Sequence, residues 1–379
     1  NFGGFSEKSY LNNNNLLYHN DGIVKWLGGF GQLEYSNDKF SFFTSLSLSS
    51  QGFKRIDYFN YMDDDTLQTT DWQTFNGGTF KTGFNFNVNQ NSRVFVNTGY
   101  FSKQPIFNNI FLNYQNDINT NEKNQSVRAF EIGYSYYNKI IDFDINAYYT
   151  EWKDRQYSRR FAPPIGHPRY DVFYLFYGIS QTHKGLEAEI NVNLSDKISL
   201  SGMVSLGDWV YTNNINSRST ILDAFGNFTA DSSDSVKILY AKGLKVGDAA
   251  QHTYSLTMKF KPFKNFSINT TYYVADQLYA PYNIWDPQYY EEGGQVTKLP
   301  IYGIARIGVY YKRKINDKFL SLKFNINNLF NTLYLAELNT NSLDENNNLY
   351  RPDQAEFYTK NKGYFGFGRT WNFGIKFSF

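Results

Sequence analysis

The chain of 379 residues contains no cysteine, which excludes a disulfide framework and a cysteine metal site. Its four histidines, His19, His167, His183 and His252, are scattered along the chain without metal-ligand spacing. No nucleophile stands beside a candidate base in the sequence. We therefore expect no metal site, no cofactor and no enzymatic activity.

Long apolar runs are also missing. No stretch approaches the roughly 18 to 20 apolar residues that a membrane-spanning helix needs. The net charge of +2 gives no case for binding nucleic acid. Aromatic residues nevertheless make up 19% of the chain, while the mean hydropathy is −0.53. A β-barrel with an aromatic exterior and a polar, Asn-rich interior accounts for both values.

The last fourteen residues, GFGRTWNFGIKFSF, show the strand pattern most clearly. Apolar and polar positions alternate with a period of two, as they do on the opposite faces of a strand. Only Arg369 interrupts the apolar face, and its place near the preceding loop puts it at the outer interface, where a charge costs about 0–1 kcal/mol. The apolar face of this predicted terminal strand carries Trp371, Phe373, Ile375, Phe377 and Phe379.

Six pairs of alternating segments precede this strand. Each pair is joined by a short turn rich in Asn, Asp, Ser or Lys, as tight hairpins require. The predicted pairs are 24–36 with 40–54, 78–90 with 93–105, 126–137 with 141–155, 181–195 with 198–212, 251–263 with 266–279, and 302–315 with 319–331.

The period of two also assigns the faces of these strands, because a shift of one residue would invert every side chain. The side chains expected to face lipid are Phe84, Ile145, Leu186, Ile190, Phe373 and Phe377. Those expected to face the lumen are Asn85, Glu187, Asn191 and Lys376.

Long polar connections separate the pairs, at 55–77, 106–125, 156–180, 213–250, 280–301 and 332–365. Short and long connections thus alternate without exception, and outer-membrane barrels combine short periplasmic turns with long outer loops in this way. The predicted fold class is all-β, an antiparallel transmembrane β-barrel, with Phe379 at the periplasmic end.

The pattern gives about thirteen strands, whereas single-chain bacterial barrels close with an even number. We interpret residues 1–23 as the remainder of an extracellular loop whose preceding strand is absent from this sequence. On this interpretation, residues 1–379 are the C-terminal part of a longer outer-membrane barrel protein.

Two motifs resemble those of a known family. The run Asn325 to Tyr334 (NINNLFNTLY), followed by a long loop and the aromatic strand, resembles the C-terminal region of TonB-dependent outer-membrane transporters. The run Lys184 to Glu189 (KGLEAE) is also similar to these barrels, and the Asn- and Tyr-rich style is similar to Bacteroidetes members. The resemblance implies a 22-stranded barrel, in which 24–36 is strand ten, and an N-terminal plug domain. The plug and the TonB-coupling box are absent from this sequence.

The resemblance further implies energised import of a scarce nutrient, such as a ferric siderophore, cobalamin or an oligosaccharide. Two alternatives remain open: a binding or scaffold subunit of a larger outer-membrane complex, and a passive porin. The expected location is the cell outer membrane. The expected partners are its lipid bilayer, the barrel-assembly machinery and TonB, reached through the absent N-terminal region, with a surface lipoprotein as a further candidate.

Two connections are candidates for contact with cargo. The loop 157–170 is basic, and it could hold an anionic ligand through Arg159, Arg160, His167 and Arg169. The loop 280–301 contains Tyr282 and Trp285, which could stack on a sugar or aryl ring. The alternative for both loops is ordinary packing and surface contact.

Two other motifs have simpler explanations. The acidic run Asp63 to Asp65 could bind Ca²⁺, but without the spacing of a calcium loop we expect a solvated tip. The glycine-rich run Gly28 to Gly31 lies in a strand pattern, so close packing explains it better than a phosphate-binding loop.

The terminal strand gives a first testable prediction. In the resembled family, the barrel-assembly machinery reads the C-terminal strand and its final aromatic residue. Burial of one Phe contributes roughly 1.5–3 kcal/mol, which is small compared with the stability of a whole barrel. An unfolded chain, by contrast, offers the assembly machinery few other features to recognise. Deletion of Phe379 should therefore lower the amount of protein in outer membranes severalfold, and the inserted fraction should keep near-normal heat resistance. Equal levels of deletion variant and wild type in immunoblots of membrane fractions would contradict this expectation.

Overall fold

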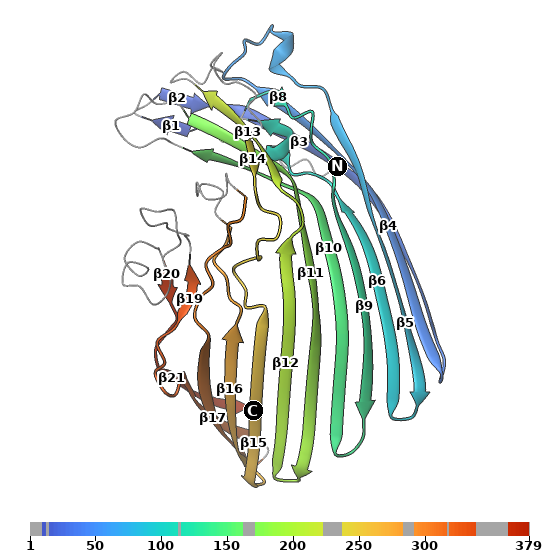
Figure 1. The fold of residues 1–379 in the computed structure, drawn as a ribbon, viewed down its shortest axis with the longest axis vertical. Coiled ribbons are helices and arrows are strands. Elements are labelled where there is room, and N and C mark those ends of the chain that lie inside the picture. The colour runs from blue at the N-terminus through green and yellow to red at the C-terminus, as the bar shows by residue number, and fades with distance from the viewer. Residues whose placement is uncertain are drawn as a thin grey trace.

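The structure is a computed structural model that describes residues 10–12, 15–112, 115–161, 171–222, 237–282, 292–316, 318–338 and 363–378. Antiparallel strands dominate it and form one large curved sheet that resembles part of a barrel wall (Figure 1). Among the residues described, no helix has the length and apolarity needed to cross a membrane.

Thirteen strands form a continuous path through this sheet, in the order β21-β18-β17-β16-β15-β12-β11-β10-β9-β6-β5-β4-β3. The thirteen predicted strands are therefore confirmed. In chain order they are β3 (Asn20–Ser36), β4 (Phe40–Asp57), β5 (Gln73–Asn89), β6 (Ser92–Lys103), β9 (Gln125–Tyr137), β10 (Ile141–Phe161), β11 (Asp171–Ser195), β12 (Ile198–Tyr211), β15 (His252–Phe263), β16 (Phe266–Asp276), β17 (Tyr302–Ile315), β18 (Lys318–Asn327) and β21 (Thr370–Ser378).

The short turns and the long connections lie at opposite ends of the sheet, as predicted (Figure 1). Ser378, the last residue of β21, pairs with Phe319 beside a short turn, so β21 ends on the turn side. The loop end carries the minor elements: β1 (Tyr10–Asn12), β2 (Asn15–Tyr18), η1 (Thr66–Gln68), α1 (Phe107–Ile110), β7 (Phe111–Leu112), β8 (Asp117–Ile118), β13 (Ile215–Leu222), β14 (Lys237–Leu239), β19 (Leu335–Leu338) and β20 (Gly363–Phe365).

Several boundaries predicted from the sequence were wrong. The segment 156–180 was predicted to be a loop, but β10 continues to Phe161 and β11 begins at Asp171. The predicted loop 213–250 contains β13, which pairs with the extended part of β11. The predicted loop remnant 1–23 contains the hairpin of β1 and β2, and β3 begins within it at Asn20. These segments lack the period-two alternation because the strands continue beyond the apolar band, where lipid no longer covers their outer face.

The two faces of the wall are assigned as predicted. The six side chains expected to face lipid are all solvent-exposed on one face of the sheet: Phe84, Ile145, Leu186, Ile190, Phe373 and Phe377. On the other face, polar side chains bond to one another across strands, as when Ser201 donates to Asn191 at 2.5 Å. An apolar outer face and a polar inner face are the signature of a membrane-embedded barrel wall.

Three clusters of buried apolar residues lie at the loop end rather than in the wall. The largest cluster joins β11, β13 and β14 to the connections on either side of β15 and β16, and its members are Phe176, Ile179, Ile215, Leu239, Ala241, Leu244, Tyr279 and Val296. The second cluster consists of Leu278, Ala280, Leu299, Leu335 and Leu338. The third consists of Phe53, Ile110 and Phe111. The described parts of these connections are thus packed against the sheet and against one another.

The predicted solvated tip and glycine-rich strand are also seen. Asp65 caps η1 by accepting from the backbone N–H of Leu67 at 2.8 Å, and Asp63 accepts from the side chain of Gln68 at 3.2 Å. Gly28 lies within β3, where the indole ring of Trp26 covers it so closely that an added Cβ would clash at 2.5 Å. Close packing therefore explains Gly28, but it does not explain Gly29 and Gly31, where an added Cβ would have no neighbour within 4 Å.

The Asn-Leu-Phe-Asn motif ends β18 and fixes the entry to β21. Asn328 has a φ of 47°, and its buried side chain donates to the carbonyls of Thr332 at 2.8 Å and Phe367 at 3.1 Å. Its Oδ1 accepts from the backbone N–H of Thr332 at 2.8 Å. Asn331 Oδ1 accepts from the backbone N–H of Arg369 at 2.8 Å. Asparagine tolerates a positive φ while bonding locally, which suits both positions.

Replacement of Asn328 by alanine should destabilise the folded wall, because three backbone groups would lose the partner that this side chain supplies. A buried group left unsatisfied costs about 1–3 kcal/mol. The measurement is heat-induced unfolding of the purified protein, followed by its gel mobility. Asn327→Ala is the matched control, because within the described ranges the Asn327 side chain makes one bond, to Thr370 at 3.3 Å. Equal transition temperatures for the two variants would contradict the role assigned to Asn328.

Candidate ligand-binding groove on the inner face

A ladder of polar side chains crosses five neighbouring strands on the inner face, from β6 to β12. Asn97 donates to Glu131 at 3.1 Å, and Asn146 donates to Glu131 and to Glu187 at 3.2 Å each. Ser205 donates to the other oxygen of Glu187 at 3.4 Å. The ladder holds two carboxylates in fixed positions, and each keeps lone pairs that can accept further hydrogen bonds.

Aromatic rings lie next to this ladder, on the side of the loops. Trp209 Nε1 donates to the hydroxyl of Tyr148 at 2.9 Å, and the ring of His183 stacks on the indole at 5.2 Å and 13°. Glycines make the space for these rings. A Cβ on Gly185 would lie 2.7 Å from the Tyr148 oxygen, and one on Gly207 would lie 2.8 Å from Trp209 Nε1. The rings therefore lie flat along the wall.

The ladder and the rings together line an open groove of about 570 Å³, which Phe101 and Trp152 also border. This volume falls within the range of small-molecule sites. Aromatic faces can stack on a flat apolar ring, and the adjacent carboxylates can accept from hydroxyl or amino groups. The groove therefore combines the chemistry needed to bind a polar molecule that has apolar faces.

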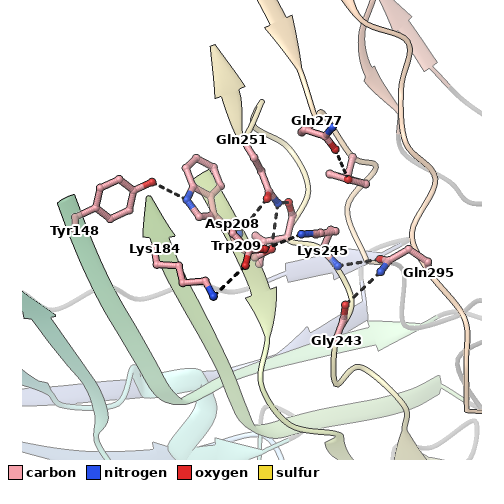
Figure 2. A network of polar contacts seen from close by, with 11 residues as sticks. Tyr148, Lys184, Asp208, Trp209, Gly243, Lys245, Gln251, Gln277 and Gln295 are labelled. Carbon is pink, nitrogen blue, oxygen red and sulfur yellow. Dashed lines mark hydrogen bonds and ion pairs between the residues drawn. The ribbon is translucent and has the colours of Figure 1, made fainter. Parts of the chain in front are cut away.

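A network of hydrogen bonds and ion pairs fixes Trp209 and the segment beside it (Figure 2). Gln251 is buried, and its side chain pairs with both backbone groups of Trp209, accepting from N–H at 3.0 Å and donating to C=O at 3.1 Å. It also donates to the carbonyl of Val246 at 3.0 Å. The connection between β14 and β15 thereby continues the sheet beside β12 and holds the indole in place.

Ion pairs and a second glutamine extend this network. Asp208 accepts from Lys184 at 3.2 Å and from Lys245 at 2.7 Å. Gln295 bonds the backbone of the same connection, accepting from the N–H of Lys245 at 2.9 Å and donating to the C=O of Gly243 at 3.2 Å (Figure 2). Two connections distant in sequence are thus tied together above the wall.

The candidate cargo residues predicted from the sequence lie elsewhere or outside the described residues. Arg159 and Arg160 were expected in a loop, but they belong to β10, where they pair with Tyr174 and Phe173 of β11. The prediction missed this because the strand continues past the apolar band. His167, Arg169 and Trp285 lie outside the described residues.

Tyr282 packs against the largest buried cluster, with its ring 5.6 Å from that of Tyr211. Its position agrees with the alternative of ordinary loop packing. Within the described ranges, no three His, Asp or Glu side chains converge as metal ligands would.

The sequence did contain a signal for the groove. Tyr148 follows the parity of Asp142, Asp144 and Asn146, so it is an aromatic residue on the polar face of its strand. Trp209 likewise shares the parity of Ser205 on β12. Large aromatic residues at lumen-facing positions of neighbouring strands therefore mark the groove.

Comparison with known proteins identifies the family. Residues 2–329 match the family model described as TonB dependent receptor-like, beta-barrel, and the chain belongs to this family. The family consists of outer-membrane receptors and transporters that work with TonB. No curated protein sequence matches the chain.

Solved structures show the same fold. The ferric citrate transporter FecA in its unliganded form is 12% identical, with a TM-score of 0.60 over 96% of this chain and 46% of that one. The copper transporter OprC is 12% identical, with a TM-score of 0.59 over 96% of this chain and 48% of that one. The siderophore receptor PiuA from Acinetobacter baumannii is 14% identical, with a TM-score of 0.58 over 95% and 44%. This chain therefore spans about half the length of these structures.

The connection between β6 and β9 contains a carboxyl group with unusual surroundings. Glu122 accepts from the side chain of Asn119 at 3.0 Å, and the same amide donates to the carbonyl of Asn109 at 2.9 Å. Asn109 and Asn119 are both buried. Burial raises the pKa of Glu122 to about 8, against the opposing effect of the Asn119 hydrogen bond. Glu122 is therefore mostly protonated in the folded connection at neutral pH.

Because the folded pKa of Glu122 is raised, its contribution to stability is fully present below about pH 4.5 and is lost as the pH rises to about 8. The measurement is hydrogen exchange at the amide of Asn119, which donates to the Ile110 carbonyl, corrected for the intrinsic effect of pH. Protection should fall between pH 5 and pH 8. Glu122→Gln keeps an acceptor for Asn119 without the charge, so its protection should be independent of pH. The same pH dependence in both proteins would contradict this account.

Proposed function

We propose that the protein containing this chain imports a scarce nutrient across the outer membrane in an energised process, with a ferric siderophore, cobalamin or an oligosaccharide as cargo. The observation that carries the proposal is the groove of about 570 Å³ on the inner face of the wall, which combines fixed carboxylates with flat aromatic rings. A ligand in this groove would lie inside the barrel. The apolar outer face would meanwhile contact the bilayer.

The family supports this proposal. The structural relatives are named as a copper transporter, a ferric citrate transporter and a siderophore receptor. Because this chain spans about half of their length, we propose that residues 1–379 are the C-terminal part of the barrel and that a plug domain and a TonB-coupling segment precede them. Residues 1–23 would then belong to the extracellular region, together with the β1–β2 hairpin that they contain.

Further contacts are proposed at the loop end. Arg159, Arg160, His167 and Arg169 would offer positive charge to an anionic cargo. Tyr282 would offer aromatic surface beside the largest buried cluster, and Trp285 would offer a further aromatic ring. We further propose two protein partners. The barrel-assembly machinery would recognise the aromatic residues on the apolar face of β21, and a surface lipoprotein would pair with the barrel.

The adjacent residues Tyr148 and Tyr149 allow a sharp test. Tyr148 lines the groove, whereas Tyr149 is 45% exposed on the outer face. In a strain that lacks the native gene, Tyr148→Ala in the full-length protein should lower uptake of the cargo about tenfold, since a lost hydrogen bond and stacking surface cost about 1.4 kcal/mol. Tyr149→Ala is the matched control and should import normally. Uptake is measured with labelled ferric siderophores, cobalamin and oligosaccharides.

Energy dependence separates the alternatives. A protonophore should abolish import, because the proposed process draws on the proton-motive force through TonB. Uptake that continues undiminished would instead indicate a passive porin. Unchanged uptake of all three cargo classes after deletion of the gene would favour a scaffold subunit and would contradict the proposal.

A further inference from the structure

The outer face contains a second groove that the transport function does not use. It has a volume of about 320 Å³ and lies between β5, β6, β9 and β10. Its walls are the rings of Phe80, Tyr100, Phe130 and Tyr149, whose exposed fractions all lie between 43% and 46%. The period of two places these rings on the lipid side of the wall.

Arg128 stands at the loop end of this groove and also lines it. Its position on β9 is nine residues from Tyr137, which ends the strand at the short turn. At about 3.4 Å per residue and a tilt of about 40°, this separation corresponds to a height of roughly 23 Å, close to the apolar band of an outer-membrane barrel. Arg128 therefore lies at the headgroup level of the leaflet on the loop side.

A second cation accompanies Arg128 on the same face. Lys153 pairs with Glu151 at 3.0 Å, while Arg128 is 3.9 Å from that carboxylate and 65% exposed. Two cations thus share one carboxylate, which leaves a net positive charge above the groove. Arg128 makes no hydrogen bond to any other side chain in the described part of the chain, so its guanidinium can still bind an anion bidentately.

We propose that this groove is a binding site for a phosphorylated lipid of the leaflet on the loop side. The phosphate would bind between Arg128 and Lys153, and a hydrocarbon chain would lie along the four aromatic rings. Two observations support this occupant together: the groove is apolar and faces the bilayer, and the cations stand where a headgroup would be. A water-soluble anion would use the cations but leave the groove empty.

Binding is measured by native mass spectrometry on the full-length protein in detergent, titrated with bisphosphorylated lipid A. The wild type should retain one lipid in preference to lipid A from which the phosphates have been removed, by at least tenfold in apparent affinity. The double substitution Arg128→Gln with Lys153→Gln should remove this preference. Arg369→Gln is the matched control and should retain it, because Arg369 is an exposed cation near the loop end of β21, away from the groove.

A third variant tests the groove itself. Thr98 lines it, so Thr98→Phe would fill it while keeping the outer face apolar, and should lower lipid retention at least tenfold. Equal loss from Arg369→Gln and from the double variant would mean that the lipid binds any exposed cation, and would overturn the proposal. Complete displacement of the lipid by an equal concentration of inorganic phosphate, or full retention in Thr98→Phe, would overturn the role of the groove.

Discussion

Main-chain hydrogen bonding between neighbouring strands is the constraint on which the rest of this structure depends. A bilayer offers no water to an unpaired N–H or C=O, so a wall that lies within it must pair each strand with a neighbour on both sides. The antiparallel ladder does this for the eleven strands between β3 and β21, with β10 and β11 paired from Ile141–Val192 to Phe161–Val172 apart from two bulges. Because the ladder fixes the direction of every side chain, a single layer of backbone separates an apolar environment from a polar one. Tyr148 and Tyr149 are consecutive in sequence, yet one lines the inner groove and the other faces outward.

A one-layer wall has no interior of its own, so its packing takes other forms. On the inner face, aromatic rings lie flat over glycines of adjacent strands: Phe43 over Gly83, Phe95 over Gly133, and Tyr148 over Gly185. Each glycine provides the space that a Cβ would fill, and the ring covers the bare backbone. Because these rings lie flat, they leave space on the inner side of the wall and present their faces to any ligand bound there. Among the described residues, conventional buried clusters form where the strands leave the apolar band and the connections fold against them.

The loop end is built from side chains that replace backbone partners. Gln251 bonds both backbone groups of Trp209, and Gln295 does the same for the connection beside β12. Asn328 performs this role between β18 and β21. Amide side chains carry both a donor and an acceptor. One such residue can therefore supply the hydrogen bonds that a neighbouring strand would otherwise make. The groove on the inner face therefore depends on residues that lie above it and do not line it.

The sequence by itself determined the number of strands, their pairing in hairpins and the face on which each side chain lies. These properties are local, because a period of two and the residues of a tight turn can be read within about thirty residues. The motif from Asn325 to Tyr334 indicated the family because it is a contiguous run of residues, although Asn328 and Asn331 also bond across to the entry of β21. Tertiary structure decided where the strands end and which residues meet. The segment 156–180 lacks the period-two alternation that predicts a membrane strand, because beyond the lipid the outer face need not be apolar and Phe176 and Ile179 pack into a buried cluster. The groove, with Glu131, Tyr148, Glu187 and Trp209 drawn from four strands, depends on the register between strands, which the pattern within any one strand does not specify.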